Sequence, residues 1–459
     1  MYFSTFYIDL RELLINVFKV MQYIKCGAEK FEFEIKPLGG LCKRCQKEIP
    51  VVSLTTQNLK LCKSCFNAIQ EKRVYETVKK FRMFNKKDRI GIFLSGGKDS
   101  ASLATLLKRL FPDYSSQGIY LNLGIGYYSE YAEKTVRELC EKIELPLFVY
   151  NLPKEEGFSI DEFVFTNFRD KICSVCGVIK RYLFSKMAKA LGLTVIATGH
   201  HLDDLLSTYL TLFFNGDFLS LKRLSPVNLP LYPGQAKKVK PLCQIPEREL
   251  FYYAILNELP LEGCACPHGE ITPAKKIKFL IEELSKENRT FKYQLMSVFL
   301  NKFLPLLKEE IKEETQFKPC LRCGEPTASA NELCSHCRRI ELLERVKDRR
   351  LELTFEEWLK SSQGELKDSW VIFDVREKED YLKGALPEAK WISKDLLENE
   401  RELIKTFKPF RDKNLLFYCY TGRLSYFFTL KLRKLGFKAY NLKHPEEIFN
   451  KVDTLQKNV

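Results

Sequence analysis

Residues 89–100 read RIGIFLSGGKDS, an apolar run that passes directly into a glycine-rich turn. The apolar part predicts a buried strand, and the following ASLATLLKRLF (101–111) predicts a helix. Two glycines let the backbone N–H groups converge on one point, where a helix N-terminus and Lys98 add positive charge. The stretch therefore predicts an anion site at the end of a strand. Its spacing differs from that of the G-x-x-x-x-G-K-[ST] phosphate loop.

The segments that follow alternate between strands and helices. Strands are predicted at QGIYLNLGI (117–125), LPLFVYNL (145–152) and LTVIATGH (193–200), and helices over 131–142 and after Cys176. This alternation predicts an α/β fold with a doubly wound, Rossmann-like parallel sheet. Such a sheet binds its ligands at the carboxyl ends of the strands.

At one of these ends, Asp203 and Asp204 follow the last predicted strand in TGHHLDD (198–204). A pair of aspartates after a strand is usually a helix cap. Beside the glycine-rich loop, however, the pair favours binding of Mg²⁺ or orientation of a substrate.

The chain has 16 cysteines, most of them in C-x-x-C pairs, which favours metal binding in a reducing compartment over a disulfide framework. Two sets of four predict zinc ribbons, because two tight turns can each present two thiolates to one tetrahedral ion. Four thiolates leave no open coordination position, so we expect structural Zn²⁺ sites, with neighbouring basic residues that contact a phosphate backbone. The first set is Cys42, Cys45, Cys62 and Cys65, and the second is Cys320, Cys323, Cys334 and Cys337.

Cys173 and Cys176 form a further pair that lacks a second C-x-x-C nearby. The next cysteines along the chain are Cys264 and Cys266, in GCACPHG (263–269). Three thiolates suit an iron–sulfur cluster with one open iron, whereas a zinc site or a redox dithiol is the competing interpretation of the spacing.

Taken together, these motifs resemble those of a known enzyme group. SGGKDS is similar to the pyrophosphate loop of the PP-loop ATP pyrophosphatase superfamily. With CSVCGVIKRY (173–182), ATGHHLDD (197–204), the late Cys-Pro and the flanking ribbons, the chain resembles the TtuA/Ncs6 group of tRNA 2-thiouridine synthetases. One departure is His201, because members of the group usually have Asn at this position.

The resemblance implies roles for individual residues. It implies a 4Fe-4S cluster on Cys173, Cys176 and Cys266, with Cys264 as the spare candidate for the third ligand. It also implies that Lys180 and Asp204 are catalytic. The implied ATP-binding residues are Ser95, Gly96, Gly97, Lys98, Asp99, Ser100 and Gly199.

A second candidate site lies near the end of the chain. NLLFY (414–418) predicts a buried strand that ends at Cys419, followed by a loop and a helix near Ser425. Loop N–H groups, the helix N-terminus and a nearby arginine would lower the pKa of the thiol and stabilise a persulfide. The segment resembles a rhodanese domain, although Ala385 replaces the usual His of the first motif and Leu424 replaces a basic residue. The implied active loop is Cys419, Tyr420, Thr421, Gly422, Arg423 and Leu424.

The two resemblances imply ATP-dependent tRNA thiolation. AMP would be transferred to the C2 oxygen of a uridine, and sulfur would replace that oxygen to give 2-thiouridine. Lys98 would stabilise the phosphates, and Asp204 would position Mg²⁺ or a proton. Cys419 would receive sulfur from a donor such as a cysteine desulfurase and pass it to the cluster or directly to the activated base. We expect the T-loop uridine as the target. The alternatives are wobble-uridine 2-thiolation, cytidine 2-thiolation, 4-thiouridine synthesis and a non-catalytic RNA-binding sulfur carrier.

Length and composition predict two to four globular domains, because the chain has 459 residues of which 45% are hydrophobic. Its formal net charge of +15 lies mainly in the first 350 residues, since residues 351–459 carry 20 basic and 18 acidic side chains. We therefore expect the first part to bind tRNA phosphates. The predicted parts are an N-terminal extension (1–40), a zinc ribbon (41–75), a PP-loop domain (76–270), a helical segment (271–315), a second zinc ribbon (316–340) and a rhodanese-like domain (350–459).

The first twenty residues are apolar but interrupted by charges, so they predict neither a membrane span nor a signal peptide. We therefore expect a cytoplasmic protein. The periodicity there favours an amphipathic helix, with a translation start at Met21 as the alternative to Met1. A homodimer is suggested by the family resemblance only.

Overall fold

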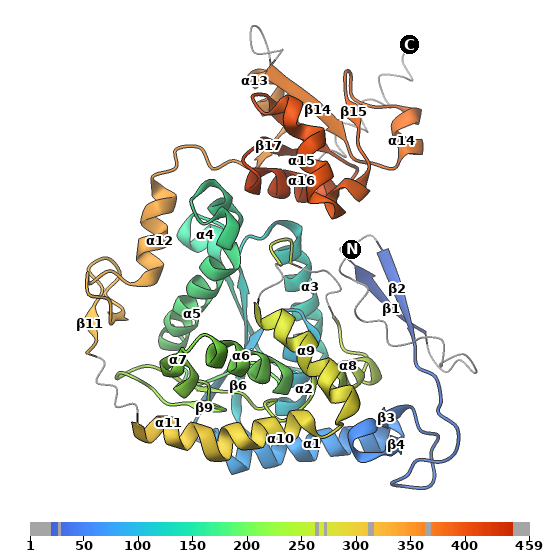
Figure 1. Ribbon diagram of the computed structural model, residues 1–459, viewed down its shortest axis with the longest axis vertical. Coiled ribbons are helices and arrows are strands. Elements are labelled where there is room, and N and C mark those ends of the chain that lie inside the picture. The colour runs from blue at the N-terminus through green and yellow to red at the C-terminus, as the bar shows by residue number, and fades with distance from the viewer. Residues whose placement is uncertain are drawn as a thin grey trace.

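The computed structural model describes residues 20–25, 29–261, 266–269, 273–310, 316–362 and 369–443 (Figure 1). A helix was expected within the first twenty residues, and this segment lies almost wholly outside the described residues. The choice between Met1 and Met21 as the start concerns the same segment. Cys264 also lies outside them. No described helix is both long and apolar enough to cross a membrane.

The middle of the chain is built around one six-stranded sheet, in the order β7-β6-β5-β8-β10-β9. All neighbours are parallel except β9, which pairs antiparallel with β10. The expected doubly wound parallel sheet is therefore confirmed. The strands are β5 (Arg89–Leu94), β6 (Ser115–Asn122), β7 (Leu147–Asn151), β8 (Val195–Ala197), β9 (Val227–Asn228) and β10 (Lys237–Val239).

Alternate strand residues point to two different cores, as a sheet covered on both faces requires. In β5, Ile90, Ile92 and Leu94 pack in one core, and Phe93 packs in the other. β8 repeats the pattern, with Ile196 on the second face. The parallel strands are thus buried on both sides.

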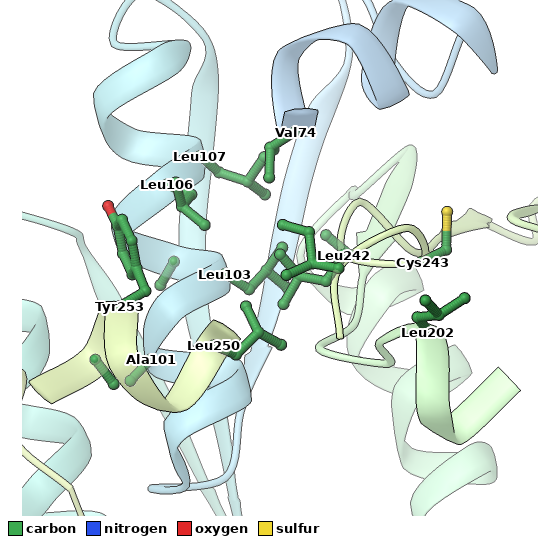
Figure 2. Close-up of a cluster of buried hydrophobic side chains, with 14 of the residues drawn as sticks. Val74, Ala101, Leu103, Leu106, Leu107, Leu202, Leu242, Cys243, Leu250 and Tyr253 are labelled. Carbon is green, nitrogen blue, oxygen red and sulfur yellow. The ribbon is translucent and has the colours of Figure 1, made fainter. Parts of the chain in front are cut away.

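Helices cover both faces of the sheet (Figure 1). The first core contains α2 and α8, and Figure 2 shows Leu103 of α2 beside Leu250 of α8, and Leu107 of α2 beside Val74. The second core surrounds α5. The helices of this part are α1 (Lys63–Lys80), α2 (Lys98–Leu110), α3 (Gly126–Lys142), α4 (Leu152–Glu156), α5 (Ile172–Ala190), α6 (Leu202–Phe214), α7 (Phe218–Lys222), α8 (Glu247–Leu256), α9 (Pro273–Glu287), α10 (Phe291–Val298), the π-helix η6 (Phe299–Phe303) and α11 (Leu304–Glu310).

One helix begins earlier than the sequence predicts. We expected a helix after Cys176, but α5 starts at Ile172 and includes both Cys173 and Cys176 in its first turns. A C-x-x-C pair inside a helix places its two sulfurs one turn apart on the same face. Free N–H groups at a helix start also stabilise thiolates, which favours this placement.

Short hairpins precede a helix in both cysteine ribbons. The strands are β3 (Val52–Leu54) and β4 (Leu59–Leu61) in the first, and β11 (Lys318–Pro319) and β12 (Pro326–Thr327) in the second, which is followed by α12 (Ser335–Glu344). Another hairpin, β1 (Val20–Lys25) with β2 (Glu29–Glu34), precedes the first ribbon. Short 3₁₀ turns are η3 (Thr55–Gln57), η4 (Asp161–Phe165), η5 (Arg169–Lys171), η8 (Lys394–Glu398) and η9 (Lys408–Phe410).

The C-terminal domain has its own parallel sheet, in the order β13-β17-β16-β14-β15. The charged stretch over 338–360 is not one continuous helix, because α12 ends at Glu344. The chain then forms β13 (Glu352–Leu353), whose pairing with β17 completes this sheet. The remaining elements are α13 (Phe355–Ser361), β14 (Trp370–Asp374), α14 (Lys378–Lys383), β15 (Lys390–Trp391), α15 (Glu400–Phe407), β16 (Asn414–Tyr418), α16 (Arg423–Lys434) and β17 (Lys438–Leu442).

We predict that Leu103→Ala lowers the free energy of unfolding of the central part by about 2–5 kcal/mol, because it leaves a cavity at a fully buried position. All three tryptophans, Trp358, Trp370 and Trp391, lie in the C-terminal domain. Urea unfolding followed by tryptophan fluorescence therefore reports that domain, whereas far-UV circular dichroism reports both. The matched variant Leu415→Ala, in β16, should shift the fluorescence transition more than Leu103→Ala does, and the reverse order would contradict separate cores.

Candidate active site

The glycine-rich loop closes on itself between β5 and α2. The backbone N–H of Ser95 donates to Ser100 Oγ at 3.1 Å, and that hydroxyl donates to the carbonyl of Gly97 at 3.0 Å. Gly96 adopts φ +80°, and a Cβ there would lie 3.1 Å from the Cα of Ala132 on α3. The loop thus needs glycine for its left-handed backbone and for its contact with a neighbouring helix. Because α2 begins directly after the loop, its first N–H groups are available to an anion.

Another glycine brings the β8–α6 loop against the first turn of α2. A Cβ on Gly199 would lie 3.1 Å from the backbone carbon of Asp99 and from the backbone nitrogen of Ser100. Backbone atoms cannot move aside as a flexible side chain can, so this approach requires glycine. The same loop places His201 Nε2 3.9 Å from Asp99 Oδ2. The two predicted motifs therefore form one site.

A network of charged side chains spans this site. Lys98 Nζ lies 2.7 Å from Glu247 Oε1 and 3.2 Å from Asp99 Oδ2. Lys278 Nζ lies 2.5 Å from Glu247 Oε2 and 3.2 Å from Asp204 Oδ1. Four helices, α2, α6, α8 and α9, contribute to this network. Glu247 is the carboxylate that joins the two lysines.

Burial and charge act in opposite directions on the pKa values of this network. Burial alone would raise the pKa of Glu247, but Lys98 and Lys278 outweigh it and lower that pKa to about 2. For Asp99, burial dominates and raises the pKa in spite of Lys98. Burial would lower the pKa of Lys98, yet Asp99 and Glu247 raise it. Burial would lower the pKa of Lys278 too, but Asp204 and Glu247 raise it, so both lysines stay charged at neutral pH.

The two adjacent aspartates have different surroundings. Asp203 is 2% exposed, accepts the backbone N–H of Glu247 at 2.7 Å and pairs with Lys292 at 2.6 Å. It therefore satisfies the first N–H of α8, although it lies in α6 and not at the start of α8. The side chain of Asp204 is 36% exposed, so it is the aspartate of the pair that a substrate can reach.

Three side chains in the network offer a potential cation site. Ligand atoms of Asp99, His201 and Glu247 all lie within 4.8 Å of one another. Asp99 Oδ1 and His201 Nδ1 are buried and have no hydrogen-bond partner among the described residues. Carboxylate oxygens are the ligands that Mg²⁺ prefers, so the two acids fit this ion better than the imidazole does. The structure groups Asp99 with Glu247 here, whereas the sequence favoured Asp204.

The third cysteine group also assembles. Cys173 Sγ donates to the carbonyl of His268 at 2.9 Å, which ties the turn after Cys266 to the first turn of α5. Burial raises the pKa of Cys266 to about 11 and also raises that of Cys176, while the nearby Lys180 acts in the opposite direction on both thiols. Among the described residues, these three cysteines do not form a group whose sulfur atoms all lie within 4.8 Å of one another. A 4Fe-4S cluster binds its thiolates through different irons, so a spacing wider than that around one ion fits it.

Both predicted cysteine ribbons close into compact groups of four thiols. Within each group, all four sulfur atoms lie within 4.8 Å of one another, as ligands of one ion require. The second ribbon also packs on α5, because the His336 ring stacks on the Tyr182 ring with centroids 3.7 Å apart. The groups are Cys42, Cys45, Cys62 and Cys65, and Cys320, Cys323, Cys334 and Cys337.

In the C-terminal domain, Cys419 follows directly after β16, as predicted. It is 6% exposed, and its Sγ lies 3.4 Å from Ser425 Oγ on the next helix. Gly422 adopts φ +71° and ends the loop, so α16 begins at Arg423, two residues before the predicted start. The thiol therefore lies beside the first turn of α16.

Comparison with known proteins agrees with this geometry. The PP-loop domain family matches residues 67–261, and the rhodanese-like domain family matches residues 356–444. A tRNA-5-methyluridine(54) 2-sulfurtransferase from Pyrococcus horikoshii is 33% identical over 297 residues, which cover 65% of this chain and 92% of that protein. The chain belongs to this tRNA 2-sulfurtransferase family.

Other members and relatives of the 2-sulfurtransferase family give the same result. The protein of the same name from Thermotoga maritima is 32% identical and covers 67% of this chain and 98% of its own. Cytoplasmic tRNA 2-thiolation protein 1 of Aspergillus niger is 27% identical over 65% of this chain and 87% of its own. The fold matches that of the U34-tRNA thiolase NcsA from Methanococcus maripaludis, solved with its [4Fe-4S] cluster, with a TM-score of 0.55, 24% identity and coverage of 66% and 96%.

Sequence reasoning missed several residues of this 2-sulfurtransferase site. Glu247 and Lys278 were not singled out, and the segment 271–315 was expected to be helical without a role. In the structure, α9 packs on α6 and carries Lys278 into the site. The available signal was weak: Glu247 follows Pro246 at a helix start, and Lys278 lies in a lysine-rich helix like many exposed ones.

We predict that Gly199→Ala weakens ATP binding by about tenfold or more, because its Cβ would press on backbone atoms of the α2 first turn. Equilibrium binding of ATP to the purified protein measures this. Gly39→Ala is the control, since no atom of the described residues lies within 4 Å of a Cβ there. Equal affinities of the two variants would show that the close approach of the two loops is unimportant for the nucleotide.

Proposed function

We propose that this chain uses ATP to activate the C2 oxygen of a tRNA uridine and replaces that oxygen with sulfur, giving 2-thiouridine. One observation carries the proposal. The anion loop after β5 and the thiols at the start of α5 belong to the same carboxyl edge of one parallel sheet, where ligands of such folds bind. An activating site and a sulfur site therefore lie on one side of the domain.

The proposed chemistry has two steps. The uracil O2 attacks the α-phosphorus of ATP, the bond to the β-phosphate breaks, and pyrophosphate leaves. A sulfur nucleophile then bonds to C2 and the C2–oxygen bond breaks, so that AMP carries the oxygen away. The proton lost from N3 in the first step is replaced by the one that the sulfur gives up. Adenylation thus converts an oxide-like leaving group into AMP.

Residues of the anion loop would serve the first step. The loop N–H groups and Lys98 would stabilise the charge that develops on the leaving pyrophosphate, and Lys278 adds a second cation nearby. Asp99 and Glu247 would hold Mg²⁺, which neutralises phosphate charge when bound. Asp204, which is partly exposed, would face the substrate as predicted.

The thiols of Cys173, Cys176 and Cys266 would hold the 4Fe-4S cluster, which supplies an open iron as a binding place for sulfur. Lys180 lies on α5 close enough to act electrostatically on Cys176 and Cys266. Its charge would favour the anionic forms of these thiols and of the incoming sulfur. The NcsA structure with its cluster supports this assignment through a shared fold.

Cys419 would supply the sulfur as a persulfide. Its terminal sulfur attacks C2 as AMP leaves, which links Cys419 to the base through a disulfide. A thiol reductant then attacks Cys419 Sγ, the thiocarbonyl leaves, and a second thiol reduces the remaining disulfide. A cysteine desulfurase is the expected donor that reloads Cys419. This donor, a cytoplasmic location and a homodimer stay predictions.

We propose the T-loop uridine as the target. Three relatives named tRNA-5-methyluridine(54) 2-sulfurtransferases are 31–33% identical to this chain, whereas cytoplasmic tRNA 2-thiolation proteins are 27–28% identical. The wobble uridine is the second candidate, because the matching fold belongs to a U34-tRNA thiolase. The basic excess of the first 350 residues supports tRNA binding by this part of the chain.

The test is ATP cleavage and tRNA thiolation by the anaerobically purified protein. We predict tRNA-dependent formation of AMP and pyrophosphate, with 2-thiolated uridine at the T-loop position by mass spectrometry of tRNA fragments. Lys180→Ala should abolish thiolated product, whereas Lys154→Ala, on exposed α4, should not. Pyrophosphate release that does not depend on tRNA, or thiolation at the wobble position alone, would contradict the proposal.

The two cysteine ribbons are proposed to bind two Zn²⁺ ions. We predict two zinc equivalents per chain by elemental analysis and one in Cys320→Ser, because loss of one of four thiolates weakens a closed site. Cys243→Ser is the control, since Cys243 is buried in the central core and belongs to neither group of four. An unchanged zinc content in Cys320→Ser would exclude the second site.

A further inference from the structure

The helix that follows the Cys419 loop belongs to two hydrophobic cores. Phe428 and Leu432 of α16 pack in the core of the rhodanese-like domain. Tyr426 and Leu430 pack instead in the core that surrounds α5 of the PP-loop domain. This division follows the period of a helix, which puts the two pairs on different faces. Figure 1 shows α16 on the side of its domain that faces α3 and α4.

A chain of buried polar groups crosses this contact. Tyr426 Oη donates to Asp161 Oδ2 at 2.5 Å, and the other carboxylate oxygen pairs with His268 Nε2. Asp161 is fully buried, and Tyr426 is 7% exposed. The carbonyl of His268 accepts the hydrogen bond from Cys173 Sγ at 2.9 Å. The bonds thus lead from the helix behind the Cys419 loop to one of the proposed cluster ligands.

Aromatic contacts add a second connection, to α3. Arg423 lies with its Cζ 4.2 Å from the ring centroid of Tyr131. The rings of Tyr127 and Tyr426 meet edge to face at 6.2 Å. Gly422 packs so closely that a Cβ there would lie 2.6 Å from Tyr127 Oη. The end of the Cys419 loop itself therefore contacts the PP-loop domain.

This second connection reaches the anion loop. Tyr131 is the chain neighbour of Ala132, and a Cβ on Gly96 would lie 3.1 Å from the Cα of Ala132. The same few residues of α3 thus contact the Cys419 loop through Arg423 and the anion loop through Gly96. The contact joins the sulfur-carrying loop to both halves of the proposed thiolation site.

We propose that this contact is the docked delivery state of the rhodanese-like domain, that the Tyr426–Asp161 hydrogen bond holds it, and that sulfur passes within one chain. The proposal rests on the proposed function, because Cys419 must carry the sulfur. A buried carboxylate that loses a partner is costly, so Asp161 favours the docked position. In the transfer, the terminal persulfide sulfur bonds to C2 as AMP leaves, and an added thiol reductant then frees the thiocarbonyl. Tyr426 is a positioning residue in this step.

Tyr426→Phe tests the hydrogen bond, because it removes only the hydroxyl and keeps the ring in the core. The full chain is loaded at Cys419 with ³⁵S by a cysteine desulfurase, and transfer of ³⁵S to tRNA is measured in a single turnover with ATP and dithiothreitol. We predict transfer about tenfold or more slower than in the unaltered protein, from loss of one buried hydrogen bond to a charged group. An unchanged transfer rate would overturn the role of this bond.

Two further measurements separate positioning from general damage. Loading of Cys419 with ³⁵S, and thiolation with sodium sulfide in place of the persulfide, should be unchanged in Tyr426→Phe. Amide hydrogen exchange over 420–430 and 159–163 should become faster, because the docked contact opens more often. Tyr381→Phe is the matched control: its hydroxyl donates to the carbonyl of Ala389 at 3.1 Å inside the rhodanese-like domain. A similar loss of transfer in this control would overturn the specific role of Tyr426.

A mixing experiment tests transfer within one chain. Cys419→Ala lacks the sulfur carrier, and Lys98→Ala lacks a proposed ATP-binding lysine but can still be loaded with sulfur. Transfer within one chain predicts that an equimolar mixture thiolates tRNA no faster than the two variants measured apart. Restoration of about half the unaltered rate by mixing would overturn this proposal.

Failure of this proposal differs from failure of the proposed function. If Cys419→Ala alone thiolates at the unaltered rate with cysteine and desulfurase as the sulfur source, the proposed source of sulfur is wrong. If Cys419→Ala is inactive in that assay while Tyr426→Phe is unaffected and mixing restores activity, Cys419 carries the sulfur and only the docked delivery is wrong.

Discussion

Parallel strands end at the same edge of a sheet, and the arrangement of this molecule depends on that constraint. The chain segments after β5, β6, β7, β8 and β10 all emerge at one edge of the central sheet. They carry the anion loop, the start of α3, the cysteines of α5, the aspartates of α6 and the glutamate of α8. No single segment holds the site. The close approach at Gly96 and Gly199 then packs these segments without space for a larger residue.

A buried carboxylate, that of Asp161, holds together the part of the molecule where the cysteines and the C-terminal domain come into contact. Asp161 lies in η4, and its two oxygens are taken by His268 and Tyr426, which come from distant parts of the chain. A buried charge is tolerated only when its partners are in place. The turn that carries Cys266 and the helix that follows Cys419 are therefore fixed by the same residue. In the proposed docked state, this one side chain connects the turn after Cys266 with the C-terminal domain.

Local sequence patterns predicted much of the molecule, but they could not predict which distant residues pair with each other. The β5 strand, the glycine-rich loop and both cysteine ribbons were predictable. Hydrophobic periodicity, turn residues and the spacing of metal ligands each depend on a few residues that are close in the sequence. Glu247 and Lys98 form a hydrogen bond although they are 149 positions apart in the sequence, and Tyr426 and Asp161 do so at a separation of 265 positions. Neither pair carries a local signal, since a charged or aromatic residue in a helix is ordinary. The start of α5 was misplaced because a C-x-x-C motif suits both a loop and a helix start.

The segment that connects the two domains, around residues 349–353, packs against both of them and so differs from a flexible linker. Leu351 belongs to the core around α5, whereas Leu353, two residues later, belongs to a core of the rhodanese-like domain. Arg349, just before them, pairs with Glu162 at 3.0 Å, in the same short helix as Asp161. A flexible linker would raise only the effective concentration of Cys419 near the site. Because this connection is buried at both ends, it also restricts the angle of approach, and the Tyr426 and Arg423 contacts can set the orientation of the Cys419 loop.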